Sequence, residues 1–461
     1  MMRTHTCGQL TKDNVGQTVT LCGWVDSRRD HGSLIFIDLR DRFGCTQIDF
    51  FKSNKELFEE IKKVRSEFVL LIEGIVQERP KGTENDKMPT GLIEVHAASM
   101  RILNESETPP FEISDESEMG EESRLKYRYL DLRRPKMTKN IILRYRVCKI
   151  IRDTLDKEEF IEVETPILTK STPEGARDYL VPSRVNQGNF YALPQSPQLF
   201  KQILMVSGLD RYFQIVKCFR DEDLRADRQP EFTQLDMEMS FVSQDDIFKI
   251  SENVIKAVFK EALDIEIKTP FLRLTHKESL EKYNTDKPDL REKGEGYKFV
   301  WIVDFPLFKY NEQEKRWESE HHPFTSPHED DIEMLSKSPE GVRSSSYDLV
   351  INGVEVGSGS IRINKKELQK KIFEIINMPG DEVEARFGFL LEAFEYGAPP
   401  HGGVAFGIDR LLTLLTGDAS IRDVIAFPKT QRATCPLTGA PSIVDKKQLD
   451  ELSLEIKLKK G

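Results

Sequence analysis

The sequence predicts an α+β protein in which a small five-stranded β-barrel precedes a larger antiparallel sheet flanked by helices. Five short strand-like runs fill about the first 105 residues, whereas the rest alternates helical patterns with hairpins. Between the two parts, residues 105–122 hold eight acids and no base, which is typical of a solvated linker. We therefore expect a barrel domain at 1–107, a linker at 108–135 and a second domain at 136–461.

Composition limits the class of protein before any motif is considered. The chain has 461 residues, 38% hydrophobic and 31% charged, with a formal net charge of −11, which favours a globular protein over a disordered one. No run approaches the roughly 20 apolar residues of a membrane helix, and the first residues lack the apolar segment of a signal peptide. The six cysteines are scattered singly, so we expect no zinc ribbon, no dense disulfide framework and a cytoplasmic location.

The first domain is predicted to be an OB-fold. Strand-like runs occupy residues 19–25, 34–39, 46–50, 68–74 and 92–95, with one short helix at 55–63. Such barrels bind single-stranded nucleic acid on exposed aromatic rings beside basic side chains. Suitable residue types are Arg28, Arg29, Phe36, Gln47 and Arg79. Alternation along the second run nevertheless favours a core position for Phe36.

A basic stretch follows the linker. Residues 124–149 hold ten bases and one acid, Asp131. A phosphate-facing role and an ordinary solvated surface remain equally open for it.

The second domain lacks the common nucleotide-binding signatures. No G-x-x-x-x-G-K-[ST] is present and no G-x-G-x-x-G follows a strand, which disfavours P-loop and dinucleotide-binding folds. Helical patterns predict six helices, at residues 138–157, 196–207, 245–262, 365–377, 381–395 and 407–415.

A long hairpin is the first segment with chemical content. Residues 212–220 and 232–241 alternate as strands around an arginine-rich loop. The period of two places Gln234, Asp236 and Glu238 on one face, with apolar residues on the other. Burying this polar face is costly unless an anionic ligand with an ammonium group lies there; an exposed sheet face is the alternative.

A second hairpin turns at Asn352-Gly353, a pair typical of a type I′ turn. In that register Val350 faces Glu355 and Asp348 faces Gly357, so Asp348 and Glu355 share a face as a diagonal pair. Two such carboxylates can hold Mg²⁺ and leave sites for phosphate oxygens. Arg362 joins that face only if residues 357–360 contain a bulge.

A third segment, residues 397–412, combines close backbone approach with an anion site. Gly402 and Gly403 let the backbone approach a ligand, and a strand then runs into a helix at Gly407. Arg410 in the first turn would reinforce the attraction of the helix N-terminus for anions.

Taken together, the three segments resemble the class II aminoacyl-tRNA synthetases, and within them the bacterial aspartyl type. Phe219-Arg220-Asp221-Glu222 through Asp236 resembles motif 2, Gly407-Ile408-Asp409-Arg410 resembles motif 3, and the segment ending in Pro166 resembles the dimer-forming motif 1. Residues 171–178, 195–202 and 321–325 are similar to stretches specific to that subclass.

The resemblance implies an ATP-dependent, Mg²⁺-assisted homodimeric enzyme that joins L-aspartate to tRNA(Asp). Arg220 and Arg410 would be catalytic, and Asp348 and Glu355 would hold Mg²⁺. The implied ATP-binding residues are Arg220, Asp221, Glu222, Gln229, Glu355, Gly407, Ile408, Asp409 and Arg410. The implied aspartate-binding residues are Glu174, Gln198, Lys201, Arg220, Asp236, His321, His322 and Arg362. The implied anticodon-binding residues are Arg29, His31, Phe36, Gln47, Arg79, Gly82 and Glu94, and Pro166 would lie in the dimer interface.

Two departures from the family pattern stand out. Bacterial relatives carry an inserted domain between motifs 2 and 3, whereas here only residues 292–298 separate the flanking segments, so we expect that domain to be absent. His31 with Gly82 is similar to relatives that charge both tRNA(Asp) and tRNA(Asn), with neutral loop drift as the alternative. Rival interpretations are a related enzyme for asparagine or lysine and a non-catalytic RNA-binding paralogue.

Overall fold

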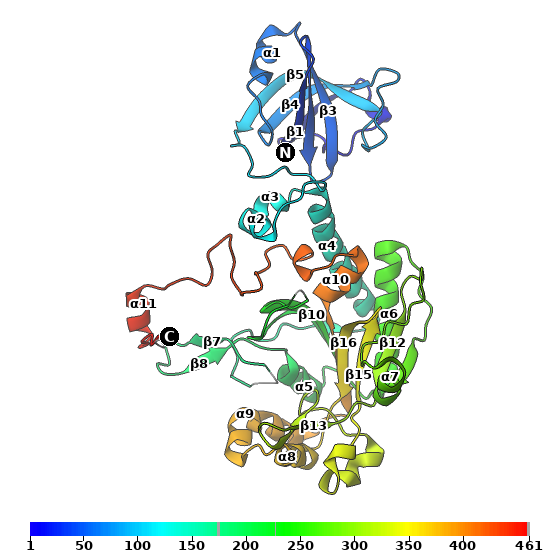
Figure 1. The fold of residues 1–461 in the computed structure, drawn as a ribbon, viewed down its shortest axis with the longest axis vertical. Helices are drawn as coiled ribbons and strands as arrows, with labels where there is room; N and C mark the ends of the chain where they lie inside the picture. The colour runs from blue at the N-terminus through cyan, green and yellow to red at the C-terminus, as the bar shows by residue number, and fades with distance from the viewer. Residues whose placement is uncertain (173–175, 226, 459–461) are drawn as a thin grey trace. The chain divides into compact units, whose positions relative to one another are not determined.

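The computed structural model describes residues 1–172, 176–225 and 227–458. The chain divides into two compact units, each described by itself below. One comprises Met1–Gly120 with Tyr129–Thr138, and the other comprises Glu121–Arg128 with Lys139–Gly461 (Figure 1). Among the described residues, no helix is long and apolar enough to cross a membrane.

The first unit is a closed barrel with strand order β1-β2-β3-β5-β4, as an OB-fold requires. Its elements are β1 (Thr18–Asp30), β2 (Leu34–Asp41), β3 (Gly44–Phe51), α1 (Lys55–Ile61), β4 (Val69–Glu78) and β5 (Ile93–Asn104). Ile35, Ile37 and Leu39 point into the barrel and are fully buried. Phe36 lies between them on the outer, partly exposed face, so its expected core position is wrong.

The second unit is built on an eight-stranded, mainly antiparallel sheet with order β11-β12-β15-β16-β17-β10-β9-β6. Only the β11–β12 and β6–β9 pairs are parallel. The strands are β6 (Ile161–Glu162), β9 (Arg211–Phe219), β10 (Glu231–Ser240), β11 (Leu272–Thr275), β12 (Phe299–Val303), β15 (Ser346–Ile351), β16 (Val354–Ile361) and β17 (His401–Gly407). Two short hairpins lie outside this sheet: β7 (Leu180–Pro182) with β8 (Phe190–Ala192), and β13 (Phe308–Asn311) with β14 (Arg316–Ser319).

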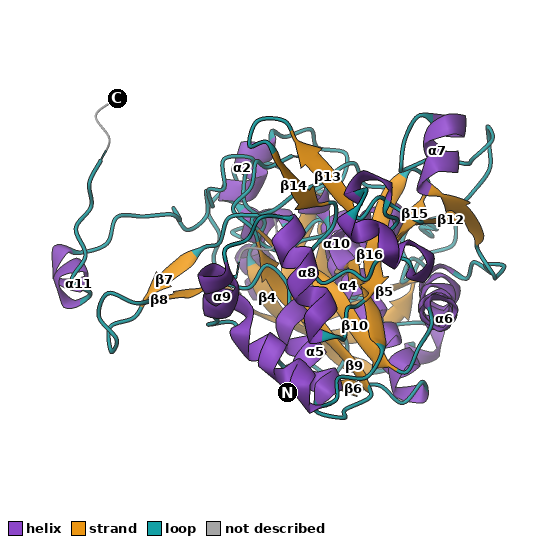
Figure 2. Ribbon diagram, turned by 90° about the horizontal axis from the view of Figure 1, so that it is seen from below, coloured by secondary structure: helices purple, strands orange, loops and turns teal. Residues whose placement is uncertain are grey.

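Helices surround the sheet, as Figure 2 shows. They are α2 (Glu121–Lys126), α3 (Arg128–Asp131), α4 (Pro135–Lys157), α5 (Gln198–Val206), α6 (Gln244–Leu263), α7 (His276–Tyr283), α8 (Lys366–Ile375), α9 (Gly380–Ala393), α10 (Ile408–Thr416) and α11 (Lys446–Glu451). All six predicted helices are present. The predicted linker is only partly irregular, because α2 and α3 form within it.

The two faces of the sheet differ in chemistry. Leu235, Met237 and Met239 of β10 join Val404 and Phe406 of β17 in one large apolar core with α6. The opposite face of the same strands carries the polar residues. Since successive side chains of a strand alternate between faces, burying one face in this core fixes which residues the other face presents.

The Asn352-Gly353 hairpin contains a bulge that the predicted register lacked. Val350 faces Glu355 as expected, but Asp348 faces Ser358 and not Gly357, because the register shifts between Leu349 and Val350. The extra residue is Val356, which points into the apolar core. The bulge therefore lies just before residues 357–360 and not within them, and it brings Arg362 onto the face of Asp348.

The basic stretch is mostly occupied by internal contacts. Arg128 is buried and donates to the backbone carbonyls of Arg422, Ile425 and Ala426. Arg144 pairs with Asp409 at 2.5 Å, and Arg124 pairs with Asp423 at 2.8 Å. These arginines stabilise the second unit, so the phosphate-facing interpretation fails for them.

Substitution of Gly403 tests the close packing of the central strands. A Cβ atom there would lie 2.0 Å from the Met237 carbonyl oxygen, so Gly403→Ala forces β10 and β17 apart. We expect a loss of about 1–3 kcal/mol in the free energy of unfolding, measured by thermal denaturation. Gly380→Ala is the matched control, because a Cβ atom there meets nothing within 4 Å. Equal melting temperatures for both variants would contradict this account.

Candidate active site

The polar face of the large sheet has small residues at its centre and charged residues around them. Ser358 pairs with Ala405, and Ser360 pairs with Gly403. Next to them on β10, Asp236 faces Ala405 and Glu238 faces Gly403. Small side chains allow a ligand to approach these strands closely, and a ligand on this face would be bordered by the acids of β10.

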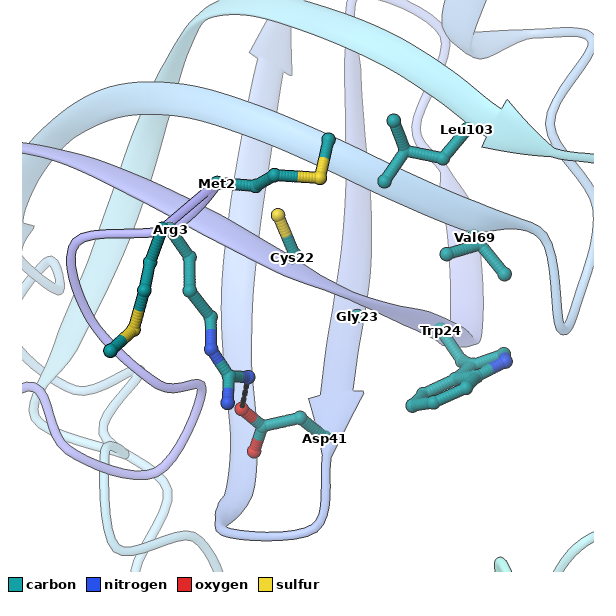
Figure 3. A pocket seen from close by; sticks show the side chains of 9 residues that line it. Met2, Arg3, Cys22, Gly23, Trp24, Asp41, Val69 and Leu103 are labelled. Carbon is teal, nitrogen blue, oxygen red and sulfur yellow. Dashed lines mark hydrogen bonds and ion pairs between the residues drawn. The ribbon is translucent and has the colours of Figure 1, made fainter.

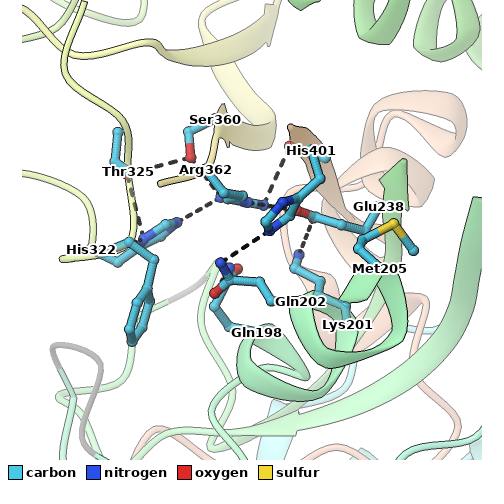
Figure 4. A network of polar contacts seen from close by, with 12 residues as sticks. Gln198, Lys201, Gln202, Met205, Glu238, His322, Thr325, Ser360, Arg362 and His401 are labelled. Atoms are coloured by element: carbon cyan, nitrogen blue, oxygen red, sulfur yellow. Dashed lines mark hydrogen bonds and ion pairs between the residues drawn. The ribbon is translucent and has the colours of Figure 1, made fainter. Parts of the chain in front are cut away.

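Two cations and two carboxylates form a buried network beside these small residues, and Figure 4 shows three of its members, Lys201, Glu238 and Arg362. The Lys201 ammonium, from α5, lies 2.8 Å from Asp236 Oδ2 and 3.4 Å from Glu238 Oε2. The Arg362 guanidinium binds Glu238 with both Nε and Nη2, at 2.9 and 3.0 Å. All four side chains are at most 3% exposed. Buried charges persist only when paired in this way.

The two acids of the network differ in pKa. Burial raises the pKa of Asp236, although the Lys201 charge opposes that shift. Burial also acts on Glu238, but the positive charges of Arg362 and Lys201 outweigh it and lower the pKa of Glu238. Glu238 is therefore the firmly ionised partner of Arg362 at neutral pH.

One oxygen of Asp236 has no hydrogen-bond partner. Within the described residues, Asp236 Oδ1 is buried and unpaired. The nearby Tyr212 hydroxyl donates to Gln214 Oε1 at 3.1 Å. A buried carboxylate oxygen without a donor is costly, so this atom is suited to receive a donor from a ligand, such as an ammonium group.

The two adjacent histidines have different partners. His322 Nε2 accepts from Arg362 Nη1 at 2.7 Å, whereas His321 Nε2 lies 3.5 Å from Asp348 Oδ1. Burial and the Arg362 charge hold the pKa of His322 well below its ordinary value, so it is a neutral acceptor. For His321, burial alone would lower the pKa, but the hydrogen bond and charge of Asp348 raise it.

Two glutamines of α5 lie beside the polar face of the sheet. Gln198 donates to Gln202 Oε1 at 3.2 Å, and Gln202 lies 3.2 Å from His401 Nε2. His401 Nδ1 donates to the Pro399 carbonyl at 2.8 Å, which leaves Nε2 as the acceptor from Gln202. Burial lowers the pKa of His401, so this relay is neutral.

A second charged cluster lies around Glu355. Its Oε2 is 2.8 Å from the Lys287 ammonium, and its Oε1 is 3.4 Å from Arg410 Nη1. Burial alone would raise the pKa of Glu355, but Lys287 and Arg410 lower it. Asp348 is 5% exposed, and within the described chain its Oδ1 has no hydrogen bond apart from the long contact to His321. No group of three metal-binding side chains occurs in the part of the chain that the structure describes.

Two cations in and beside the motif 2 loop, Arg220 and Arg225, form no ion pair with any described residue. The Arg220 guanidinium lies 5.1 Å from the centre of the Phe232 ring, and it forms no ion pair with any described residue. Glu222 pairs with Arg228 at 3.1 Å, and Asp221 lies 3.7 Å from Arg177. Arg220 and the exposed Arg225 are thus the cations of this segment that are available to an anion.

Some predicted site residues are engaged elsewhere. Both ends of the Gln229 amide bond to the Lys429 backbone, at 2.7 and 2.9 Å. The Asp409 carboxylate binds Arg144 and the Thr233 amide, on the apolar side of β10. These contacts favour structural roles for the two side chains. Glu174 lies outside the described residues.

The outer barrel face carries the predicted anticodon residues. Arg29 binds Asp38 and Gln47, each at 3.0 Å, and Gln47 donates to Glu94 at 2.8 Å. The Phe36 ring packs edge-on against His31, with centroids 5.8 Å apart. Arg79 is different, because it is 7% exposed and donates to the Ile93 carbonyl; Gly82 has a positive φ of 91° in the neighbouring turn.

A pocket of about 390 Å³ lies elsewhere on the barrel (Figure 3). Cys22, Trp24 and Leu103 line it, and Arg3 pairs with Asp41 at its edge. None of the predicted site residues lines this pocket.

Sequence reasoning missed several members of the site. Glu238 shares the predicted polar face of Asp236, so the period of two was a usable signal for it. Ser360, Gln202 and His401 needed the strand register and the position of α5. Lys287 comes from the loop at the expected deletion, and nothing in its local sequence indicates a site.

Comparisons with known proteins agree with this architecture. Residues 120–431 match the family "tRNA synthetases class II (D, K and N)", and residues 19–103 match "OB-fold nucleic acid binding domain". The chain is 46% identical to the aspartate–tRNA(Asp/Asn) ligases of Caldanaerobacter subterraneus subsp. tengcongensis and Thermoanaerobacter sp., covering 99% of each sequence. It is also similar in fold to asparaginyl-tRNA synthetase from Pyrococcus horikoshii complexed with asparaginyl-adenylate, at 22% identity, with a TM-score of 0.76 and coverage of 93% and 99%.

Removing the Glu238 charge tests the buried network. Glu238→Gln leaves Arg362 and Lys201 without full compensation, so we expect a loss of about 3–5 kcal/mol in the free energy of unfolding at pH 7. The pKa of Glu238 is lower in the folded state than in the unfolded state. The stabilisation of the fold by the Glu238 charge is therefore full at pH values above the ordinary glutamate pKa of about 4.3, and it declines as the pH falls below that value. The stability gap between the two proteins should therefore narrow on acidification.

Denaturant unfolding at pH 7 and at about pH 4 measures that gap. The exposed control Glu281→Gln should change stability little, because its contact with Lys277 is a surface pair at 3.9 Å. A gap that widens as the pH falls would contradict the assignment of charges.

Proposed function

Because the chain belongs to the class II tRNA synthetases (D, K and N), we propose that it is an aspartate–tRNA ligase. It activates L-aspartate with ATP, releases pyrophosphate, and transfers aspartate to the 3′ end of tRNA(Asp). The observation that carries the choice of amino acid is the Lys201–Arg362 pair on the polar sheet face, beside the unpaired Asp236 Oδ1.

The three groups match the charges of aspartate. Lys201 and Arg362 bind the side-chain carboxylate, with neutral His322 holding the guanidinium in place. Asp236 Oδ1 accepts from the substrate ammonium, and Gln198 completes that part of the site. An asparagine amide would face two cations with an NH₂ group and leave them unsatisfied, which costs several kcal/mol. This reasoning disfavours an asparagine or lysine enzyme on the same core.

The nucleotide binds the charged groups around Arg220 and Glu355, on the polar face of the large sheet. Arg220 binds the α-phosphate and the attacking carboxylate, while Arg410 lies toward the γ-phosphate. The start of α10 at residues 407 and 408 lies beside the nucleotide. Asp221 and Glu222 also line the nucleotide site. The contacts of Gln229 and Asp409 suggest that these two residues support this site without touching ATP.

Asp348 and Glu355 suit a magnesium ion. Mg²⁺ is usually bound by one or two carboxylates plus waters and phosphate oxygens, so a cage of three protein ligands is not needed. The buried Asp348 Oδ1, which has only the long contact to His321, fits this requirement, as does the pairing of Val350 with Glu355, which puts Asp348 and Glu355 on one face. When bound, the ion would neutralise phosphate charge during the reaction.

The residues act mainly by position and charge. The aspartate α-carboxylate attacks the α-phosphorus in line, the bond to the bridging oxygen breaks, and the electron pair leaves with pyrophosphate. Arg220 holds nucleophile and phosphate together and offsets the charge that develops between them. No proton is transferred in this step, so no protein base is required.

The barrel supplies the tRNA contact in this proposal. Phe36 and His31 offer rings for base stacking, next to Arg29, Gln47 and Glu94. Buried Arg79 shapes the turn that contains Gly82. We also propose tRNA(Asn) as a substrate on two grounds. The chain carries His31 and Gly82, and its relatives are named as ligases for both tRNA(Asp) and tRNA(Asn).

A homodimer in the cytoplasm completes the proposal. Exposed apolar side chains lie on α4 and around β6 and Pro166: Ile142, Tyr145, Ile161, Ile167 and Leu168 are 39–68% exposed. A second copy covering them would remove a patch that isolated proteins seldom expose.

Alignment lengths support the missing inserted domain. The alignment with the Caldanaerobacter relative spans 585 positions, whereas this chain has 461 residues, so at least 124 positions (585 minus 461) have no counterpart here.

Amino-acid selectivity is the test of the proposed activity. Pyrophosphate exchange into ATP should depend on L-aspartate, with L-asparagine and L-lysine each at least 100-fold less effective in kcat/KM. Arg362→Gln should lower kcat/KM for aspartate by at least 100-fold, because the carboxylate loses a charge-assisted partner. Exchange that is indifferent to the amino acid would exclude this activity, and no exchange at all would favour the non-catalytic paralogue.

Charging of purified tRNA(Asn) tests the second substrate. We expect aspartylation of both tRNA(Asp) and tRNA(Asn), and His31→Leu should reduce the tRNA(Asn) reaction more than the tRNA(Asp) reaction. Gln17→Ala, at an exposed barrel position that is not among the proposed anticodon residues, serves as the control. If tRNA(Asn) is not charged, the inference from His31 is wrong while the tRNA(Asp) activity still stands.

A further inference from the structure

A lysine outside the three motifs reaches the proposed triphosphate site. Lys287 lies in the loop between α7 and β12, where the inserted domain is expected to be missing. Its ammonium is 2.8 Å from Glu355 Oε2, while Arg410 contacts the same carboxylate through Oε1. Glu355 is therefore held between two cations, one on each oxygen.

The loop holds Lys287 against the second hairpin. Its backbone amide donates to Thr285 Oγ1 at 3.1 Å. Further along, a Cβ atom on Gly353 would lie 3.3 Å from Asp289, and the Asn352 side chain accepts from the Lys298 amide at 2.8 Å. The loop thus contacts the β15–β16 turn on both sides of residues 290–297, so the position of Lys287 relative to Glu355 is set by the fold.

The charge balance around Lys287 leaves it available to an anion. Besides Glu355, the charges of Asp286 and Asp348 act on this ammonium, and Arg410 is the other described cation that contacts Glu355. With a divalent ion on Asp348 and Glu355, these carboxylates no longer need Lys287 for compensation. A partly exposed lysine on a flexible stem can then turn to phosphate oxygens.

We propose that Lys287 is a phosphate-binding residue that contacts the pyrophosphate portion of ATP. The inference rests on the proposed nucleotide site and deepens it. As the bond between the α-phosphorus and the bridging oxygen breaks, the electron pair goes to pyrophosphate, and Lys287 donates to the oxygens that gain charge. The lysine stays protonated throughout, so it supplies electrostatic stabilisation and no proton.

Nucleotide binding separates this role from a structural one. Calorimetry with Mg²⁺ present should show that Lys287→Gln weakens ATP binding by roughly tenfold or more, because a charge-assisted hydrogen bond is lost. AMP lacks the β- and γ-phosphates, so its affinity should change less than twofold. Lys287→Arg should retain most of the ATP affinity.

Lys298→Gln is the matched control. This lysine lies in the same loop, its side chain is 42% exposed like that of Lys287, and it pairs with Glu295 at 2.8 Å. It should change neither ATP nor AMP binding. Thermal unfolding of each variant checks that the fold is retained.

The outcomes are distinguishable from those of the proposed function. Equal effects of Lys287→Gln on ATP and AMP, or no effect on either, would overturn the phosphate role and leave Lys287 as an ion-pair partner of Glu355. If ATP binding falls selectively but exchange does not depend on aspartate, Lys287 keeps its role and the choice of amino acid is wrong. A wild-type protein that does not bind ATP would overturn both.

Discussion

Burying Lys201 and Arg362 on one face of a sheet is the constraint on which the catalytic unit depends. Burying either cation is costly unless a carboxylate pairs with it. Asp236 and Glu238 provide these carboxylates from successive positions on the polar face of β10. The same strand buries Leu235, Met237 and Met239 in the apolar core. The core therefore fixes the register that keeps the acids in place, and a slip of one residue would exchange the two faces.

This arrangement also explains why the site is preformed. Glu238 is committed to Arg362 by two hydrogen bonds, so the guanidinium keeps its orientation before any ligand arrives. Asp236 shares Lys201 but leaves one oxygen unpaired. A ligand ammonium group adds a partner to Asp236 Oδ1. A ligand carboxylate at Arg362 replaces one of the present contacts of the guanidinium, which donates to Glu238, His322, Ser360 and the Gly403 carbonyl. Preorganisation of this kind reduces the reorganisation that binding and reaction would otherwise require.

Much of this could be predicted from sequence, since the strongest signals were local. The period of two on β10, the Asn352-Gly353 turn and the helix after Gly407 each depend on neighbouring residues, and all three hold in the structure. The five barrel strands and the six helices follow from similar patterns. The match to known motifs then predicted one site for Arg220, Lys201 and Arg362, and the structure joins Lys201 and Arg362 through Glu238.

What could not be predicted depends on long-range packing. The bulge at Val356 exists because an apolar residue turns into the core, and it moved the partner of Asp348 by one position. Phe36 lies on the outer barrel face because Ile35 and Ile37 fill the interior. Asp409 and Gln229 bear motif signatures but are held by Arg144 and by the Lys429 backbone. Arg144 and Lys429 lie 265 and 200 residues away from Asp409 and Gln229 in the sequence.

A crystal structure with a non-hydrolysable aspartyl-adenylate analogue would test the central claim most directly. The account predicts that the side-chain carboxylate of the analogue lies within hydrogen-bonding distance of both Lys201 Nζ and the Arg362 guanidinium, with its ammonium on Asp236 Oδ1. A carboxylate bound elsewhere, with Lys201 and Arg362 still paired only to Asp236 and Glu238, would show that the network is structural and would contradict the account.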